Sequence, residues 1–558
     1  MSGKNYAVLL QDLARTHGSK TALIDDAGTI TFSGLADRTN RLAAGLSGLG
    51  VGPGDVVAIW LPNTIEWAEI ALAAGRLGAT ALGVNTKLRS HDVQQLVAES
   101  GAKVLVTYPG FKGIDFLGML ADISRSAAGM PRSLTHIVHI RSAGLPRPSG
   151  PDGGTLVDYE TLLEGDAACP TAPGGAAELP AHAFTSSGST GRPKIILHNQ
   201  RGLLFHGHEV AGRFGYDAQD AVVFGALPLC GVFGFNTLMA ALAAGRPLVL
   251  QSVFNPEDAL SLVEKHQITH MNLSDTMLRM MLDALADPGR VASWREAAFG
   301  NFTATDPMDM IRTGEQLGKK FFQTYGSSEV MALMTYPEQG STAGRWALGG
   351  GVPVSEDIEV RIRDADTGLP VAAGAHGEIE VRGPNLSIGV LTADGIRPQP
   401  LGADGFLGTG DLGYLRTARD VVYLARMGDA LRLGGFLVSP REVEAFLGGL
   451  TGVFEAQYVA VGGPNGLVPV AFVIVDKGEN SKGSITEEDI IAACRARLAA
   501  FKVPRRVLIV DNFPMVRGAN GDKVQRNTLR EFAYEHLYGR AGNNADAAST
   551  SGKNGQRV

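Results

Sequence analysis

The spacing of hydrophobic residues over the first three hundred positions alternates between a helical and a strand period. Leu35, Leu42, Leu46 and Leu49 recur on one face of a helix. Short apolar runs between such helical segments have the length of buried strands, namely residues 55–62, 104–108, 137–140, 221–227, 247–253 and 268–273. Strands that alternate with helices of this length predict parallel β-α-β units.

The pattern changes twice further along the chain. Residues 142–180 are rich in Gly, Pro, Ala and Asp, which indicates a long loop-like excursion (an insertion) within the first domain rather than a domain boundary. Residues 346–425 contain strand-like runs that are separated by turns. We interpret this second segment as a smaller β-rich subdomain.

A separate unit begins after Arg426. Its helical segments are 440–449 and 486–499, and its strand-like segments are 457–461, 470–475 and 506–510. Thr486 with Asp489 is a capping-box pattern for the second helix. The last twenty residues almost lack large apolar side chains, which is typical of disorder.

These patterns predict an α/β fold with two domains. The expected units are a large N-terminal domain of layered βαβ sheets plus the β-rich subdomain (1–425), a small α+β C-terminal domain (426–538) and a disordered tail (539–558). A length of 558 residues is too great for one hydrophobic core, which also favours more than one domain.

Composition narrows the classes of function. The formal net charge of -7 gives no electrostatic case for nucleic acid or an anionic membrane surface. The three cysteines are far apart, so they predict neither a disulfide framework nor a Cys-based metal site. No run of 18 apolar residues and no signal-peptide core occur, so we expect a cytoplasmic protein without a membrane span.

The stretch 184–194 (FTSSGSTGRPK) combines hydroxyl side chains, glycines and a lysine. It is not a Walker loop, because the spacing of its glycines differs and a proline precedes the lysine. Glycines permit close backbone approach, exposed amides bind anions, and a lysine adds a point charge. The candidate phosphate contacts are Ser186, Ser187, Gly188, Ser189, Thr190, Gly191 and Lys194. A flexible Ser/Gly loop is the alternative for this stretch taken alone.

Further motifs follow in a fixed order. They are 322–330 (FQTYGSSEV), 408–415 (GTGDLGYL), 425–444 (ARMGDALRLGGFLVSPREVE), 501–507 (FKVPRRV) and 521–526 (GDKVQR). With the Ser/Gly stretch, this order resembles the adenylate-forming superfamily, which includes acyl-CoA and aryl-CoA synthetases, adenylation domains of peptide synthetases and beetle luciferases. The resemblance extends from about Thr31 to Arg526.

The resemblance implies an ATP-dependent, AMP-forming acid–thiol ligase. Such an enzyme joins a carboxylate to the α-phosphate of ATP and then transfers the acyl group to the thiol of CoA. It implies Lys523 as the catalytic lysine and Glu329 as the Mg²⁺ ligand. Ser328 matches the contact to the α-phosphate. The adenine and ribose contacts match Tyr325, Asp411 and Arg426.

The small domain is implied to be a mobile lid that alternates between the two steps. Gly428 occupies the hinge position, where the family usually has a carboxylate or lysine. The thioester step and CoA are assigned to Arg432, Gly434, Gly435 and Lys502. For Lys502, a solvated basic turn is the alternative. Asp522 stands beside Lys523, where a glycine is usual.

The acyl pocket departs most from the family pattern. Gly231 stands where a bulky His or aromatic residue is usual, and Phe302 stands in a block that is usually Gly-Gly-Ala. Phe235 and Gly326 complete the predicted pocket. Because the missing ring would leave a cavity, we expect an apolar monocarboxylic acid with a cyclic, aromatic or medium-chain acyl group.

Two alternatives keep the fold and change the function. A stand-alone adenylation enzyme would load a carrier-protein phosphopantetheine instead of CoA, although no fused carrier domain is visible. A nucleotide-binding protein that has lost ligase activity would be consistent with Gly428, Asp522 and Gly231. A luciferase-type monooxygenase has no supporting feature. The oligomeric state stays open, with a homodimer as one option.

Overall fold

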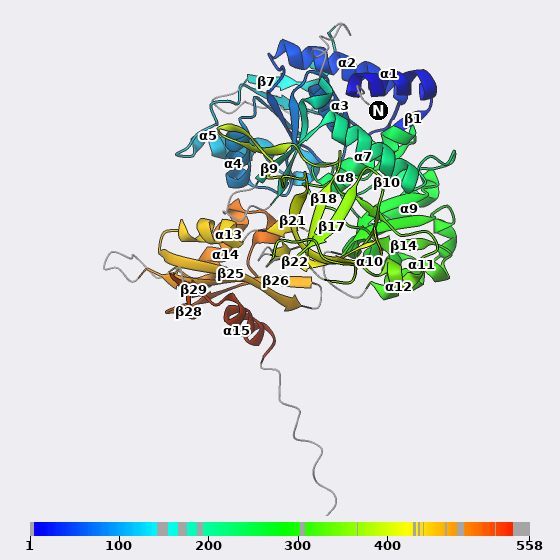
Figure 1. The fold of residues 1–558 in the computed structure, drawn as a ribbon. Coiled ribbons are helices and arrows are strands. Elements are labelled where there is room, and N and C mark those ends of the chain that lie inside the picture. The colour runs from blue at the N-terminus through cyan, green and yellow to red at the C-terminus, as the bar shows by residue number, and fades with distance from the viewer. Residues whose placement is uncertain are drawn as a thin grey trace, which may run out of the picture.

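A computed structural model describes the chain from residue 5 to residue 539, with gaps. The gaps are residues 142–154, 166–175, 187–193, 302–306, 365–366, 376, 428–430, 434–435, 439, 464–465, 477–484 and 519–520. The large N-terminal part contains three sheets, and a smaller unit of later residues lies beside it (Figure 1).

The first large sheet has nine strands. Their order is β20 (Gly395–Pro398), β19 (Gly389–Thr392), β9 (Lys194–Asn199), β8 (Pro180–Ser186), β4 (Thr80–Gly83), β3 (Val56–Trp60), β5 (Val104–Thr107), β6 (His136–His139) and β7 (Thr155–Asp158). The strands from β8 to β7 are parallel, and β9, β19 and β20 continue the sheet in antiparallel pairs. Strand β3 is buried at every position, which explains its continuous apolar run.

The second large sheet has seven strands. Their order is β14 (Lys320–Gln323), β13 (Glu296–Gly300), β12 (His270–Ser274), β10 (Val223–Gly225), β11 (Leu248–Leu250), β1 (Thr21–Ile24) and β2 (Thr29–Thr31). All neighbours are parallel except β1 and β2. The predicted parallel β-α-β organisation is therefore present in both sheets.

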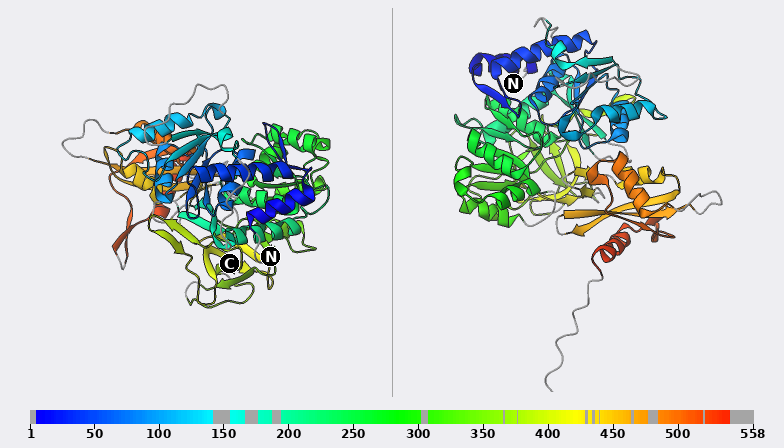
Figure 2. Two further views of the ribbon diagram at one scale, coloured as in Figure 1. Left: turned by 90° about the horizontal axis from the view of Figure 1, so that it is seen from above. Right: turned by 180° about the vertical axis from the view of Figure 1, so that it is seen from behind.

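Helices fill the space between the sheets and cover their outer faces. Trp67 of α3 and Phe235 of α8 share one hydrophobic cluster with Val57 of one sheet and Val223 of the other, so these helices lie between the sheets. Separate clusters bury α4 and α5 against the nine-stranded sheet, and α9, α10 and α11 against the seven-stranded sheet. Helices and sheets therefore alternate in five layers, with a sheet on either side of the central helices and further helices outside each sheet (Figures 1 and 2).

The helices of this part begin and end as follows: α1 (Tyr6–His17), α2 (Phe32–Gly48), α3 (Ile65–Arg76), α4 (Ser90–Ser100), α5 (Phe116–Arg125), α6 (Tyr159–Leu162), α7 (Gln200–Arg213), α8 (Val232–Ala244), α9 (Pro256–His266), α10 (Asp275–Ala284), α11 (Met308–Gln316) and α12 (Ala343–Trp346). Helix α2 buries Leu35, Leu42 and Leu46, as their spacing predicted. The excursion at 142–180 contributes the edge strand β7 and the short helix α6, which the sequence analysis missed.

The expected β-rich subdomain corresponds to a six-stranded sheet, except that β19 and β20 from the same segment join the nine-stranded sheet. The order of the six strands is β15 (Thr335–Tyr336), β16 (Gly350–Pro353), β22 (Val421–Arg426), β21 (Leu407–Leu415), β18 (Gly377–Arg382) and β17 (Glu359–Arg363). The paired neighbours are antiparallel. Strand β22 is the last element before the C-terminal unit begins.

The C-terminal unit is built on a three-stranded sheet of β25 (Val453–Gly463), β26 (Gly466–Val475) and β27 (Arg506–Ile509). Helices α13 (Pro440–Gly448) and α14 (Glu487–Arg497) share one hydrophobic cluster with it, and α15 (Arg526–Tyr538) shares another. Two hairpins complete it, β23 (Leu431–Leu433) with β24 (Phe436–Val438), and β28 (Met515–Gly518) with β29 (Gly521–Val524). The predicted capping box of Thr486 and Asp489 is formed.

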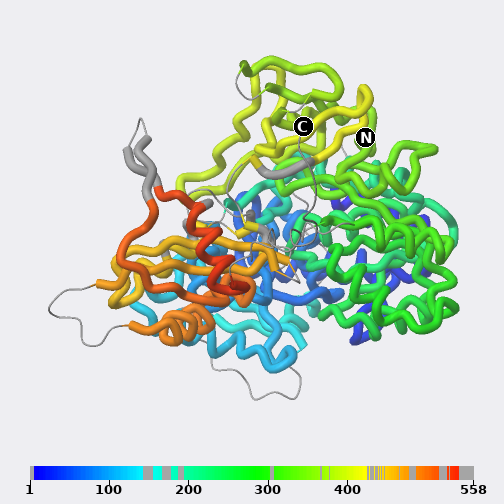
Figure 3. The backbone as a smooth tube through the Cα atoms, turned by 90° about the horizontal axis from the view of Figure 1, so that it is seen from below, coloured from blue at the N-terminus to red at the C-terminus, as the bar shows by residue number. Residues whose placement is uncertain are grey.

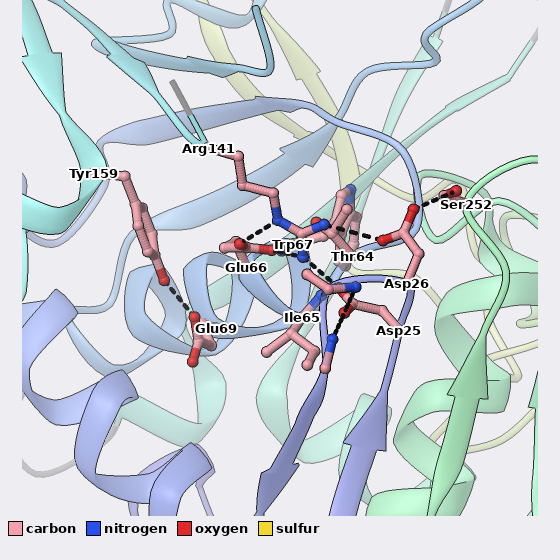
Figure 4. Close-up of polar contacts among 12 residues, drawn as sticks. Asp25, Asp26, Thr64, Ile65, Glu66, Trp67, Glu69, Arg141, Tyr159 and Ser252 are labelled. Carbon is pink, nitrogen blue, oxygen red and sulfur yellow. Dashed lines mark hydrogen bonds and ion pairs between the residues drawn. The ribbon is translucent and has the colours of Figure 1, made fainter. Parts of the chain in front are cut away.

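An ion cluster ties the two large sheets together at the start of α3 (Figure 4). Arg141, which follows β6, donates to Glu66 of α3 at 2.7 Å and to Asp26 at 3.0 Å, and it also pairs with Asp25. The two aspartates lie between β1 and β2 of the other sheet. Because the side chains of Asp25 and Glu66 are buried, removing this guanidinium would leave their charges without it in a region that water barely reaches.

No helix within the described ranges is both long and apolar enough to cross a membrane.

Candidate functional site

Two predicted nucleotide-binding residues meet in the structure. The hydroxyl of Tyr325, which follows β14, donates to Oδ2 of Asp411 on β21 at 2.7 Å. The tyrosine ring also stacks on Tyr423, with 5.5 Å between centroids and 24° between planes. Asp411 is 2% exposed, so its carboxylate is held in place by a neutral donor rather than by solvent.

The third predicted nucleotide contact, Arg426, is brought to the same place by strand pairing. Its backbone lies opposite Asp411 in the antiparallel pair of β21 and β22. Just beyond it, the amide of Met427 donates to the carbonyl of Gly410 at 2.8 Å. The GTGD turn and the start of the predicted hinge are therefore adjacent at the backbone.

The predicted phosphate loop connects two paired strands. Ser186 at the end of β8 lies opposite Lys194 at the start of β9. The intervening residues Ser187, Gly188, Ser189, Thr190 and Gly191 lie outside the described residues. The half-buried Lys194 therefore stands at one end of the loop, on a strand that continues to His198.

A set of side chains anchors the backbone of the YGSSE segment. His198 of β9 donates from Nε2 to the carbonyl of Ser328 at 2.7 Å. His206 of α7 and Asn236 of α8 both donate to the carbonyl of Ala332, at 2.8 Å and 2.6 Å. The amide group of Asn385 reaches the carbonyl of Val330 at 2.6 Å, and the backbone amide of Ser387 reaches that of Glu329 at 2.8 Å.

The two anchoring histidines are neutral donors. Burial lowers the pKa of His198 to about 4, and burial likewise lowers the pKa of His206 to about 4. A carbonyl oxygen only accepts, so Nε2 carries the proton in both rings. Both rings hold the segment without placing positive charge beside the carbonyls.

The same segment contains an unusual backbone. Met331 and Leu333 have φ angles of 65° and 58°, which non-glycine residues rarely adopt. A Cβ at Gly326 would lie 2.4 Å from the carbonyl oxygen of Met331. Gly326 is therefore needed for the close approach of the two ends of this turn. Its predicted contact with the acyl group stays a prediction.

Glu329 has the chemistry that a magnesium ligand needs. Its Oε2 accepts from Ser327 Oγ at 3.0 Å, and the residue is half-buried. Within the described part of the chain, no cation pairs with this carboxylate. A hard oxygen ligand of this kind fits Mg²⁺, which commonly binds one or two carboxylates together with phosphate oxygens.

The predicted acyl-pocket residues differ in their surroundings. Gly231 is the N-cap of α8, and among the described residues a Cβ there would meet only the Pro228 carbonyl oxygen, at 3.4 Å. Phe235 is 1% exposed and stacks on His182 at 3.9 Å, so it lies in the core between the sheets. Phe302 is outside the described residues.

The residues assigned to the mobile domain are spread over several elements. Lys523 lies on β29, opposite Val516 of β28. Arg432 lies on β23, opposite Leu437. Gly428, Gly434 and Gly435 lie outside the described residues.

Lys502 has a partner that the sequence did not reveal. Its ammonium lies 3.3 Å from Oδ1 of Asp92 in the N-terminal domain. Both side chains are more than nine-tenths buried. Lys502 is therefore not the solvated cation of the alternative interpretation.

Sequence reasoning missed the anchors of the YGSSE segment. His198 lies four positions after Lys194, but a histidine in an apolar strand carries no signal of its own. His206, Asn236 and Asn385 come from segments that no motif marked. Only the fold brings them to one turn.

Two family models match the chain. The AMP-binding enzyme model matches residues 10–391, and the AMP-binding enzyme C-terminal domain model matches residues 442–520. The 3-[(3aS,4S,7aS)-7a-methyl-1,5-dioxo-octahydro-1H-inden-4-yl]propanoyl:CoA ligase of Rhodococcus jostii (strain RHA1) is 32% identical over 533 residues, which is 94% of this chain and 97% of the relative.

Solved structures of one relative match the fold in two states. A double mutant of o-succinylbenzoate CoA synthetase from Bacillus subtilis, bound with its product analogue OSB-NCoA, gives a TM-score of 0.77 at 25% identity, covering 95% of this chain and 98% of that one. The same synthetase in complex with the acyl-adenylate intermediate OSB-AMP gives 0.64 at 24% identity, with 95% and 99% covered.

Proposed function

Because the chain belongs to the AMP-binding enzyme family, we propose that it is an ATP-dependent ligase that converts a carboxylic acid into its CoA thioester. The observation that carries the proposal is the meeting of Tyr325, Asp411 and the backbone of Arg426 beside the anchored YGSSE turn. The relatives confirm the sequence-based predictions of the family, the α/β fold, the AMP-forming ligase class and the use of ATP, Mg²⁺ and CoA.

The first step forms an acyl-adenylate. A carboxylate oxygen of the acid bonds to the α-phosphorus of ATP, the bond between the α- and β-phosphates breaks, and pyrophosphate leaves. Tyr325 and Asp411 would hold the adenosine, and Lys194 would position the terminal phosphates beside the loop. Mg²⁺, when bound at Glu329, supplies charge neutralisation for the phosphates.

The second step transfers the acyl group to sulfur. The CoA thiol bonds to the acyl carbonyl carbon, the bond from that carbon to the AMP oxygen breaks, and the thiol proton passes to solvent. We assign Lys523 to the first step, because a cation beside the carboxylate and α-phosphate stabilises the negative charge that develops there. Because Lys523 lies on the small domain, movement of that domain would take the lysine away from the reacting groups before the thiol of CoA binds.

The acid is proposed to be apolar and cyclic or aromatic. Among the described residues, Gly231 leaves space at the start of α8, where a Cβ would make a single contact at 3.4 Å. The acid named for the Rhodococcus relative contains a bicyclic ring, and the Bacillus relative is named for o-succinylbenzoate, which contains an aromatic ring. A ring that packs beside Gly231 would fill this space. The cytoplasmic location and the homodimer option stay predictions.

A product-resolved acid screen tests the proposal. The protein is incubated with ATP, Mg²⁺, CoA and a panel of cyclic, aromatic and linear acids, and acyl-CoA is detected by mass. Acyl-CoA from a cyclic or aromatic acid is expected. Acyl transfer to a carrier protein but not to CoA would favour the carrier-loading alternative. ATP binding without pyrophosphate exchange for any acid would contradict the enzyme.

A further inference from the structure

The two domains meet at a buried ion pair that belongs to neither the nucleotide site nor the acyl pocket. Lys502 and Asp92 are 410 positions apart in the sequence, and their charged atoms lie 3.3 Å from each other. The two side chains are 8% and 7% exposed. Burying such a pair removes water from both charged groups, which costs free energy. The pair therefore favours docking of the two domains only when both charges are present.

Each partner is held in place within its own domain. Asp92 is the third residue of α4, and its Oδ2 accepts from the amide of Arg89 at 3.3 Å in a capping box. The other oxygen faces Lys502. On the C-terminal side, the buried hydroxyl of Tyr458 donates to the carbonyl of Lys502 at 2.9 Å. The carboxylate of Asp92 and the backbone of Lys502 are therefore each held by a contact within their own domain.

A second contact lies beside the pair. The ring of His91 on α4 lies 5.8 Å from that of Phe446 on α13. Figure 3 shows the orange C-terminal segments lying next to the light-blue segments that contain α4. The pair thus sits within a continuous contact between α4 and the small domain.

The chain as a whole is more similar to one complex of the Bacillus synthetase than to the other. The TM-score is 0.77 for the complex with the CoA product analogue and 0.64 for the acyl-adenylate complex, at equal coverage of this chain. The contact between Lys502 and Asp92 therefore occurs in a chain whose overall arrangement is closer to the CoA-bound state.

We propose that the Lys502–Asp92 pair is an interdomain lock that positions the small domain for acyl transfer to CoA and is open during adenylation. This inference rests on the proposed function. It assigns Lys502 a positioning role in place of the predicted contact with CoA. When the domains separate, both charges return to water and each is stable alone. When they dock, loss of one partner leaves the other charge buried without this counter-charge.

Measurement of the two half-reactions tests the lock. Adenylation is followed by pyrophosphate exchange, and acyl transfer by single-turnover reaction of the preformed acyl-adenylate with CoA. Lys502→Met and Asp92→Asn are each expected to slow acyl transfer by about tenfold or more while exchange stays within about twofold. The double variant Lys502→Met/Asp92→Asn is expected to recover most of the rate, because both charges of the pair are removed together.

The controls separate this role from folding and from binding of CoA. Lys103→Met breaks a Lys–Asp pair of 3.1 Å within the N-terminal domain and should leave both half-reactions unchanged. If Lys502 instead binds CoA, Lys502→Met would raise the KM for CoA and Asp92→Asn would not. The double variant would then not recover the rate of acyl transfer. That result would overturn the lock. Equal loss in both half-reactions would also overturn it. Absence of CoA product from the wild type with every acid would contradict the proposed function instead.

Discussion

The hydroxyl of Tyr325 donates a 2.7 Å hydrogen bond to the buried carboxylate of Asp411, 86 positions further along the chain. The bond joins the YGSSE and TGD motifs, to which we assign the nucleotide contacts. Hydrogen bonds to a charged acceptor are stronger than neutral ones, so this contact fixes the carboxylate before ATP binds.

Tyr325→Phe is expected to weaken ATP binding. The ring and its stacking on Tyr423 stay, but Asp411 loses the hydrogen bond from the Tyr325 hydroxyl. A hydrogen bond to a charged group contributes about 1.5–3 kcal/mol, so we expect the KM for ATP to rise roughly tenfold or more with a smaller change in kcat. Pyrophosphate exchange at varied ATP measures this. A changed kcat with an unchanged KM would show that the hydroxyl does not serve ATP binding.

His198→Leu is expected to slow adenylation. The substitution leaves the carbonyl of Ser328 without its donor, which costs about 1–3 kcal/mol and loosens the turn that holds Glu329. His198→Gln retains a donor and should restore part of the rate. Exchange kinetics and thermal unfolding are measured together. Equal rates for the Leu and Gln variants would contradict the anchoring role.

The protein is expected to lose stability as the pH falls from 6.5 towards 4. The pKa values of His198 and His206 are about 4 when folded and 6.5 ordinarily, so the unfolded chain binds more protons in this window. The free energy of unfolding has its full value above pH 6.5. By pH 4 each histidine lowers it by on the order of 3 kcal/mol.

Urea unfolding at several pH values measures this dependence. His206→Gln should flatten the curve, whereas His208→Gln, at an exposed position on the same helix, should leave it unchanged. A curve that is equally steep in both variants would mean that His206 does not contribute to the pH dependence.

Gly231→His is expected to change the choice of acid. The new ring would fill the space that we assign to a cyclic acyl group, so bulky acids should lose kcat/KM relative to small ones. The acid panel measures the profile. Gly212→His is a matched control, because its surroundings are open and it lies at the end of α7. An unchanged preference in Gly231→His would refute the pocket assignment.

Lys523→Ala is expected to reduce adenylation far more than Lys194→Ala at saturating ATP. Lys523 would stabilise charge that develops during the reaction, whereas Lys194 would only position phosphates. Removing a charge of the first kind commonly costs about a hundredfold or more in kcat. Equal losses in kcat for both variants would show that this division of roles is wrong.

The sequence by itself determined the order of elements and the identity of the motif residues. Period and run length predicted α2, β3 and the parallel sheets, because these signals arise within a few residues of each other. The GTGD and YGSSE motifs marked Asp411 and Tyr325 without revealing that they bond. The edge strand β7 escaped detection, because short strands in a Gly- and Pro-rich segment lack a periodic signal.

Only the tertiary structure decided which distant side chains act on one another. His198 and Asn385 reach the YGSSE turn from two separate segments, and Lys502 pairs with Asp92 across 410 positions. No local pattern encodes these partners, because a buried polar group is recognised only by the group that satisfies it. Packing of the layers and docking of the small domain supply those groups.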